Sequence, residues 1–156
     1  MPRVRFILAS ASPARLRTLR DAGVVPEVIV SGVDESTLEA GSPAQLAQVL
    51  AEAKMRAVRG RVRGEALVLG CDSVLEFDGH AFGKPGHPEI AAERWRAMRG
   101  RSAVLHTGHG LMGPRQVTLA TVSTVVHFAD VTDEEIAIYC ATGEPATVAG
   151  GFTLDG

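Results

Sequence analysis

Short apolar runs alternate with longer amphipathic segments along the chain, and this pattern predicts alternating strands and helices. Strands are expected where apolar residues are continuous or alternate, and helices where they recur every three or four positions. The predicted strands cover residues 4–9, 27–31, 67–69, 74–77, 80–82, 103–112 and 117–128, and the predicted helices cover residues 13–22, 43–59, 89–98 and 133–141. Because β-α-β units are mixed with hairpins, the sequence predicts an α/β domain with a mixed sheet.

Residues with special backbone preferences support these boundaries. Ser12 suits the N-cap of the first helix. The pair Asp78-Gly79 between two apolar runs is a strong signal for a two-residue hairpin turn. Thr132 followed by Glu135 has the pattern of a capping box at the start of the last predicted helix.

Composition restricts the kinds of protein that this chain can be. Its 156 residues suggest one domain, and 46% hydrophobic residues predict a globular core. The net charge of −2 gives no electrostatic footprint for nucleic acid, and no apolar run approaches the roughly 18 residues of a membrane span. No signal peptide is recognisable, and two cysteines do not make a disulfide framework. We therefore expect a cytoplasmic protein with no nucleic-acid or membrane partner.

The segment from Leu8 to Arg15 carries the clearest chemical signal. Its small residues stand where the first strand turns into the first helix, which leaves bare backbone N–H groups that suit a phosphate. Arg15 in the first turn is unfavourable beside the positive end of the helix unless an anion is bound. Ordinary capping by Ser12 and Pro13 explains part of this pattern without a ligand.

Acidic residues follow two of the predicted strands. Asp72 comes just after the run at 67–69, at the kind of strand end where open α/β sheets bind ligands. It could hold a metal ion or act as a general base toward water, and the alternative is an ordinary turn aspartate. Asp34 and Glu35 could complete a Mg²⁺ or Mn²⁺ site, unless they form only a solvated acidic loop.

Two lysines, Lys54 and Lys84, stand out because the other basic residues among the 16 are arginines. Lys54 lies at the edge of the apolar stripe of its helix, from where it could reach a cleft or remain an exposed surface lysine. Lys84 lies in a tight Gly-Lys-Pro loop that could present a fixed charge to phosphates, or it too is simply exposed.

Other reactive residues give weaker signals. His106 and His109 fall on opposite faces of a predicted strand, so we expect no zinc pair there. Cys71 has no obvious activating base and is expected to be a buried structural thiol. Taken together, an anion-binding turn, two lysines and several carboxylates suit a polyphosphate held by a metal and cations, with water attacking phosphorus.

Nine short motifs in this chain resemble the Maf family of nucleoside triphosphate pyrophosphatases, which is related in fold to the inosine triphosphatases. They occur in the family's order and spread over essentially the whole chain. The motifs are Leu8-Ala9-Ser10-Ala11-Ser12-Pro13-Ala14-Arg15, Val33-Asp34-Glu35, Ala53-Lys54, Gly70-Cys71-Asp72-Ser73, Gly83-Lys84-Pro85, Thr107-Gly108, 124–128, Gly143-Glu144-Pro145 and Ala149-Gly150. The resemblance implies an elongated α/β fold in which helices flank a bent, mixed sheet with a central cleft.

The resemblance also implies an activity and roles for individual residues. The activity is hydrolysis of a nucleoside triphosphate to the monophosphate and pyrophosphate, with Mg²⁺ or Mn²⁺ as cofactor. Asp72 matches the proposed proton acceptor, and Glu35 and Asp72 are the expected metal ligands. The expected substrate-binding residues are Ser10, Ala11, Ser12, Arg15, Lys54, Ser73, Lys84 and Asp155. The expected partners are the nucleoside triphosphate and, as one option, a second copy of the chain in a homodimer.

The chain also departs from the family pattern. Ala14, Ser73 and Asp155 replace the arginine, threonine and glutamine typical of the branch that acts on thymidine and uridine triphosphates. The branch that acts on 7-methylguanosine triphosphate typically has tryptophan and glutamine at the first two positions, so the sequence assigns no base preference. Family members continue beyond the position of Gly156, so residues 1–156 are expected to form a single Maf-like domain without the usual C-terminal strand and helix.

Two other functions remain open on the sequence alone. Some family members are linked to arrest of septum formation, so the main alternative is a nucleotide-binding regulator of cell division with little or no catalysis. A third hypothesis is a phosphatase that releases orthophosphate.

Overall fold

The computed structural model describes residues 4–153 and arranges them around a six-stranded sheet. The strand order is β2-β1-β3-β5-β6, and β4 pairs with β3 outside this path. β1 runs parallel to β2 and to β3, whereas β3 and β4 form an antiparallel hairpin. This mixed sheet with its helices confirms the α/β class predicted from the sequence.

The observed elements follow the predicted order. They are β1 (Arg5–Leu8), α1 (Pro13–Asp21), β2 (Glu27–Val28), the 3₁₀ turn η1 (Glu35–Thr37), α2 (Pro43–Arg59), β3 (Ala66–Phe77), β4 (His80–Phe82), α3 (Pro88–Met98), β5 (Ser102–Met112), β6 (Val117–His127), α4 (Asp133–Ala141), α5 (Glu144–Thr147) and the 3₁₀ turn η2 (Ala149–Gly151). The three short helical segments η1, α5 and η2 were not predicted. The prediction of separate strands at 67–69 and 74–77 was wrong, because β3 is one continuous strand of 12 residues.

The described chain divides into two compact units. The first comprises the residues up to 41, residues 45–72 and residues 107–121, and the second comprises residues 42–44, 73–106 and those from 122 onward. Strands β3, β5 and β6 contribute residues to both units.

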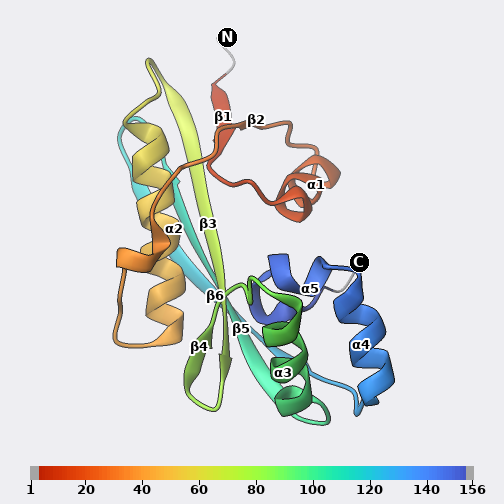
Figure 1. Cartoon of the computed structure of the whole chain (residues 1–156). Helices are drawn as coiled ribbons and strands as arrows, with labels where there is room; N and C mark the ends of the chain where they lie inside the picture. The colour runs from red at the N-terminus through yellow and green to blue at the C-terminus, as the bar shows by residue number, and fades with distance from the viewer. Residues whose placement is uncertain (1–3, 154–156) are drawn as a thin grey trace. The chain divides into compact units, whose positions relative to one another are not determined.

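In the first unit, helix α2 packs closely against the sheet, and Figure 1 shows it running alongside β3. Its buried residues recur at helical spacing: Ala47, Leu50, Ala51, Met55 and Val58. Two glycines on the strands allow this approach. A Cβ atom at Gly70 would lie 2.3 Å from the carbonyl oxygen of Ala51, and one at Gly108 would lie 2.2 Å from that of Ala47. Only glycine therefore fits at these two points of contact.

In the second unit, helices α3, α4 and α5 contact one another and form a group (Figure 1). Trp95 on α3 lies at the centre of their aromatic packing. Its ring meets the rings of Phe128 and Tyr139 edge-on, with centroids 5.2 and 5.6 Å away, and its Nε1 donates a hydrogen bond to the carbonyl oxygen of Gly151 at 2.7 Å. These contacts hold the glycine-rich segment of η2 against the helices.

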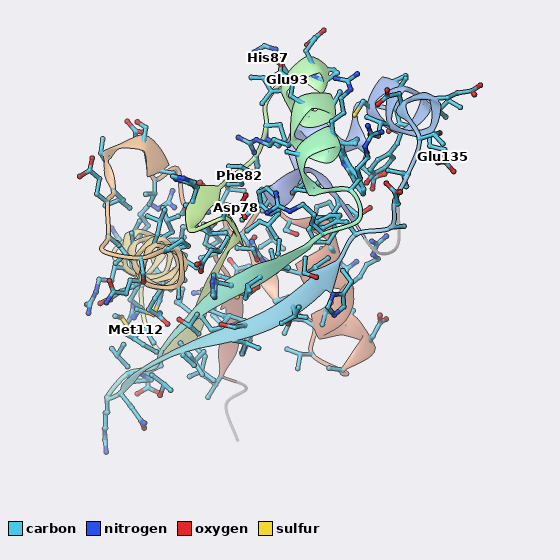
Figure 2. All side chains as sticks on the ribbon, turned by 90° about the horizontal axis from the view of Figure 1, so that it is seen from below. Asp78, Phe82, His87, Glu93, Met112 and Glu135 are labelled. Carbon is cyan, nitrogen blue, oxygen red and sulfur yellow. The ribbon has the colours of Figure 1, made fainter. Side chains whose placement is uncertain are left out.

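Two local predictions are confirmed in this unit. Asp78 and Gly79 both have positive φ, 50° and 77°, and link the paired residues Phe77 and His80, as a type I′ hairpin turn requires. Figure 2 shows Asp78 and Phe82 in this hairpin. At the start of α4, the Thr132 hydroxyl accepts a hydrogen bond from the Glu135 N–H, and the Glu135 carboxylate accepts one from the Thr132 N–H, which completes the capping box.

Both cysteines, Cys71 and Cys140, are free and buried, in agreement with the structural role expected for Cys71. Among the helices of residues 4–153, none combines the length and the apolar character needed to cross a membrane.

Candidate active site

The first turn of the chain positions two serines and an arginine. β1 ends at Leu8, and the buried Ser10 follows it before α1 begins. The Ser10 hydroxyl accepts hydrogen bonds from the Ser12 N–H at 3.2 Å and from Nη1 of Arg15 at 3.0 Å. Ser12 is the N-cap of α1, and its hydroxyl accepts a hydrogen bond from the Arg15 N–H at 3.4 Å. The capping roles of Ser12 and Pro13 are therefore confirmed, and the binding of an anion at this turn stays a prediction.

Asp72 lies in the interior of β3 and not at a strand end, which corrects the sequence analysis. Gly70 resembles a strand terminator in the sequence, but here it lies inside the strand, where its missing side chain lets α2 approach. The exposed fraction of Asp72 is 8%, so its carboxyl group is largely removed from water. A buried carboxylate in the interior of a strand requires partners, and the structure supplies them.

The ammonium of Lys54 lies between two carboxylates. Its Nζ donates to Oδ1 of Asp72 and forms an ion pair with Oε1 of Glu35 at 2.7 Å. The exposed fractions of the side chains are 12% for Lys54, 11% for Asp72 and 48% for Glu35. Lys54 is therefore not an exposed surface lysine, and its place at the edge of the apolar stripe of α2 directs it to Asp72, in agreement with one of the two expectations.

These surroundings perturb the acidity of Asp72. Burial raises the pKa of its carboxyl group above the ordinary value, and Glu35 adds to that effect, whereas the hydrogen bond and charge of Lys54 and the charge of Arg15 oppose it. The pKa of the neighbouring Cys71 thiol is also raised, mainly by burial. Asp72 is thus a buried carboxyl group with a raised pKa, and Cys71 is not an activated thiol.

The neighbouring acid Asp34 has a different role from Glu35. Asp34 is the N-cap of η1, where its Oδ1 accepts hydrogen bonds from the Ser36 N–H at 3.1 Å and from the Ser36 hydroxyl at 2.6 Å. These hydrogen bonds lower the pKa of Asp34. The turn that Asp34 caps presents Glu35 to Lys54, so only one member of this acidic pair joins Asp72.

The donor set of this cluster fits a magnesium or manganese ion. In the part of the chain that the structure describes, no group of three or more histidine, cysteine, aspartate or glutamate side chains could hold a metal. Mg²⁺, however, is commonly bound by one or two carboxylates together with water and substrate phosphates. Glu35 and Asp72, brought together by Lys54, are such a pair.

The remaining predicted site residues are not part of this cluster. Ala11 is exposed on the first turn. Ser73 and Lys84 belong to the second unit, and the Lys84 residue is exposed. Asp155 lies outside the described residues. For these four positions, substrate binding stays a prediction from the family resemblance.

The sequence analysis missed a hydrogen-bonded line in the second unit that joins Glu76, His106 and Ser123. It considered His106 only as a partner of His109 in a zinc site. The two long predicted strands, 103–112 and 117–128, could have revealed part of this line. If they pair as a hairpin with residue 112 opposite residue 117, His106 lies opposite Ser123.

Comparisons with known proteins find relatives that match nearly the whole chain. A family model described as Maf-like protein matches residues 5–156. A protein of Streptomyces avermitilis named nucleoside triphosphate pyrophosphatase is 58% identical over 159 residues, which cover 99% of this chain and 77% of the relative. A protein of Prochlorococcus marinus with the same name is 51% identical over 151 residues, which cover 96% of this chain and 82% of the relative.

The fold also has a counterpart among solved structures. A HAM1 protein from Coxiella burnetii superimposes with a TM-score of 0.52 at 15% sequence identity, and the match covers 83% of this chain and 75% of that one. At this level of identity the likeness concerns the fold alone, and it agrees with the mixed α/β architecture described above.

Proposed function

This chain belongs to the Maf family, and on that premise we propose that it hydrolyses nucleoside triphosphates to nucleoside monophosphates and pyrophosphate with the help of a divalent metal ion. The main support for the proposal is the largely buried Lys54–Asp72 ion pair, in which Lys54 also pairs with the half-exposed Glu35. Relatives that are 50–58% identical to this chain are named for the same activity.

Asp72 is the proposed general base. A carboxyl group whose pKa is raised by burial takes up a proton more readily than an ordinary aspartate does. The Lys54 ammonium holds one oxygen of this carboxylate, and the other oxygen is the proposed acceptor of a proton from water. That water attacks the α-phosphorus of the substrate, its proton passes to Asp72, and pyrophosphate leaves. General-base assistance of this kind contributes about 10²–10⁴-fold to the rate.

The cations and amides of the first unit are the proposed phosphate-binding groups. The α1 N-terminus offers backbone N–H groups after Ser12, and Arg15 projects from its first turn. Lys54 can turn from Glu35 toward a phosphate, because the Glu35 side chain is half exposed and water can solvate it. Donors of this kind stabilise the negative charge that develops on the leaving pyrophosphate.

Glu35 and Asp72 are the residues that would hold Mg²⁺ or Mn²⁺. Such an ion supplies positive charge to the triphosphate and lowers the pKa of bound water. The cluster of one ammonium and two carboxylates has a formal charge of −1 when all three groups are ionised, which favours a cation in its vicinity. We include a cytoplasmic location in the proposal, since both cysteines are free thiols.

The test is a panel of common and modified nucleoside triphosphates, incubated with the purified protein and either Mg²⁺ or Mn²⁺, with pyrophosphate and orthophosphate measured separately. We expect pyrophosphate as the product and loss of turnover when EDTA removes the metal. Release of orthophosphate alone would identify a phosphatase. Equilibrium binding of nucleotides without any product would instead support a regulator of cell division and contradict the proposal.

A further inference from the structure

The line Glu76–His106–Ser123 joins a carboxylate, an imidazole and a hydroxyl group in the order of a serine hydrolase triad, with the two ring nitrogens exchanged relative to the usual arrangement. His106 Nε2 lies 2.7 Å from Oε2 of Glu76, and His106 Nδ1 lies 2.8 Å from the hydroxyl oxygen of Ser123. The three residues come from β3, β5 and β6 and belong to the same compact unit. A nucleophile within hydrogen-bond reach of a base, which a third group orients, is the geometric signature of an activated hydroxyl group.

His106 is the most buried member of this line. The His106 side chain is 9% exposed and the Glu76 side chain is 34% exposed. Ser123 belongs to the exposed residues of β6, the last strand in the order of the sheet. The base is therefore shielded from water while the hydroxyl group is accessible to a substrate.

The proton positions follow from hydrogen-bonding capacity. An ionised Glu76 carboxylate can only accept, so Nε2 of His106 carries the proton of that hydrogen bond. In the neutral imidazole, Nδ1 is then the acceptor, and the Ser123 hydroxyl donates to it. This tautomer is the one in which His106 can remove the hydroxyl proton.

The register of β5 and β6 adds a backbone donor. The Phe128 N–H donates to the Arg101 carbonyl oxygen at 2.9 Å and so pairs these two residues across the antiparallel strands, while the Arg101 N–H donates to the Met98 carbonyl oxygen. Five positions along the ladder, His106 lies opposite Ser123 in a non-hydrogen-bonded pair, where side chains are closest. The backbone N–H of Ser123 then points away from β5, toward the edge of the sheet, where it can stabilise an oxyanion.

We propose that Ser123 is a nucleophile that accepts the acyl group of small esters, with His106 as the base and Glu76 as the group that orients it. This activity is independent of the proposed pyrophosphatase activity. The oxygen of Ser123 bonds to the ester carbonyl carbon, the hydroxyl proton passes through His106 Nδ1 to the departing alkoxide, and the ester C–O bond breaks. Water then cleaves the acyl-serine with the same nitrogen as base, which releases a carboxylic acid and restores the hydroxyl group.

One apolar side chain beside Ser123 can contact an acyl group. Val125, two positions along β6 and therefore on the same face as Ser123, is 57% exposed. Its side chain offers the short apolar contact that an acetyl or propionyl group can cover.

The chain contains a matched control for this inference. Ser102 and His127 form a second cross-strand pair, with the serine oxygen 2.7 Å from His127 Nδ1. Both residues are exposed. Within residues 4–153 the structure shows no carboxylate bound to His127. The pair has a nucleophile and a base but lacks the orienting group, so Ser102 should not be activated.

The experiment uses p-nitrophenyl acetate with the purified protein and follows both p-nitrophenol release and the acetylated residue by peptide mass mapping. We expect acetylation of Ser123, its loss in Ser123→Ala, no change in Ser102→Ala, and about 10²–10⁴-fold slower acetylation in Glu76→Gln. Circular dichroism and pyrophosphate release serve as folding checks for each variant.

Three results would overturn the proposal. They are equal p-nitrophenol release by the wild type and Ser123→Ala, equal acetylation of Ser102 and Ser123, and an unchanged rate in Glu76→Gln. Any of these results would mean that Glu76 and Ser123 only provide hydrogen-bond partners for the buried His106. None of them bears on pyrophosphate release, so this proposal and the pyrophosphatase proposal fail separately.

Discussion

Two polar clusters each take an acidic residue from β3, and they differ in how their charges are balanced. Asp72 shares the Lys54 ammonium with Glu35, so two carboxylates face one cation. Glu76 instead hydrogen-bonds to His106, which in turn hydrogen-bonds to Ser123. With every carboxylate ionised and His106 neutral, each cluster has a formal charge of −1. The Asp72 side chain is 11% exposed and the Glu76 side chain is 34% exposed, so water solvates the charge of the second cluster more readily.

This difference indicates what each cluster requires from outside the chain. A carboxylate that is 11% exposed is unfavourable unless an opposite charge lies close to it. The Lys54 ammonium is that charge for Asp72, but it also pairs with the half-exposed Glu35. A bound cation or a proton would complete the balance, and the raised pKa of Asp72 reflects the second option. The hydrogen-bonded line places an imidazole between a carboxylate and a hydroxyl group, so it is suited to moving a proton between them.

The largest expected effect comes from Asp72→Asn. The amide keeps the shape of the side chain but cannot accept a proton from water, so pyrophosphate release should fall by about 10²–10⁴-fold. The matched control is Glu76→Gln, the same change at the other acid of β3, which should leave pyrophosphate release at the wild-type rate. Turnover of the Asp72→Asn variant at the wild-type rate would remove Asp72 from the mechanism.

Lys54→Met should have the next largest effect. Methionine keeps much of the stem of the side chain and removes the charge, so the Asp72 carboxylate loses its ammonium partner and the substrate loses a cation. Loss of one such electrostatic contact typically costs about 10²–10³-fold in rate. Steady-state measurement of pyrophosphate release tests this expectation, with Arg56→Met on the exposed side of α2 as the control. A variant that loses no more activity than the control would assign Lys54 a structural role only.

The first unit also shows which features of the site can be predicted from the sequence. The turn after β1 was predicted because its signals are local: Ser12 caps the helix and Pro13 begins it. The apolar stripe of its own helix left two interpretations of Lys54, a lysine that reaches a cleft or an exposed surface lysine. Glu35 was expected as a metal ligand, but its ion pair with Lys54 was not predicted. That pair is formed by a 3₁₀ turn that depends on the hydrogen bond between Asp34 and Ser36.

The position of Asp72 was missed for a different physical reason. In a sequence, Gly70 before polar residues indicates the end of a strand, whereas in the structure it marks the place where the backbone of α2 meets β3. That meaning depends on a helix distant in sequence, so no local pattern contains it. The line through His106 was missed for a related reason, since it requires the register of three strands at once.

Gly70→Ala tests whether this close approach matters for stability. The new Cβ would lie 2.3 Å from the Ala51 carbonyl oxygen and 2.7 Å from the Met55 nitrogen, and backbone atoms cannot swing aside. We expect a loss of about 1–3 kcal/mol in the free energy of unfolding, as for other overpacked sites. Gly60→Ala is the control, because its nearest atoms lie at an ordinary 3.6 Å. Urea unfolding of both variants decides the matter, and equal stabilities would show that α2 can move away without cost.

The smallest expected effect concerns the pH dependence of the first cluster. Because the folded state raises the pKa of Asp72, folded protein binds a proton more tightly than unfolded protein, so this group's contribution to stability declines as pH rises from the unfolded pKa through the folded one.

Glu35→Gln removes a charge that raises the pKa of Asp72 and should lower that pKa, whereas Lys54→Met should raise it. Carbon-13 NMR titration of Asp72 in metal-free protein can follow both shifts, with the Asp72→Asn spectrum as assignment. Glu76→Gln should leave the titration of Asp72 unmoved, since Glu76 is not among the groups that set its pKa. If neither Glu35→Gln nor Lys54→Met shifted the titration of Asp72, burial alone would govern its pKa, and the charges of Glu35 and Lys54 would have no part in it.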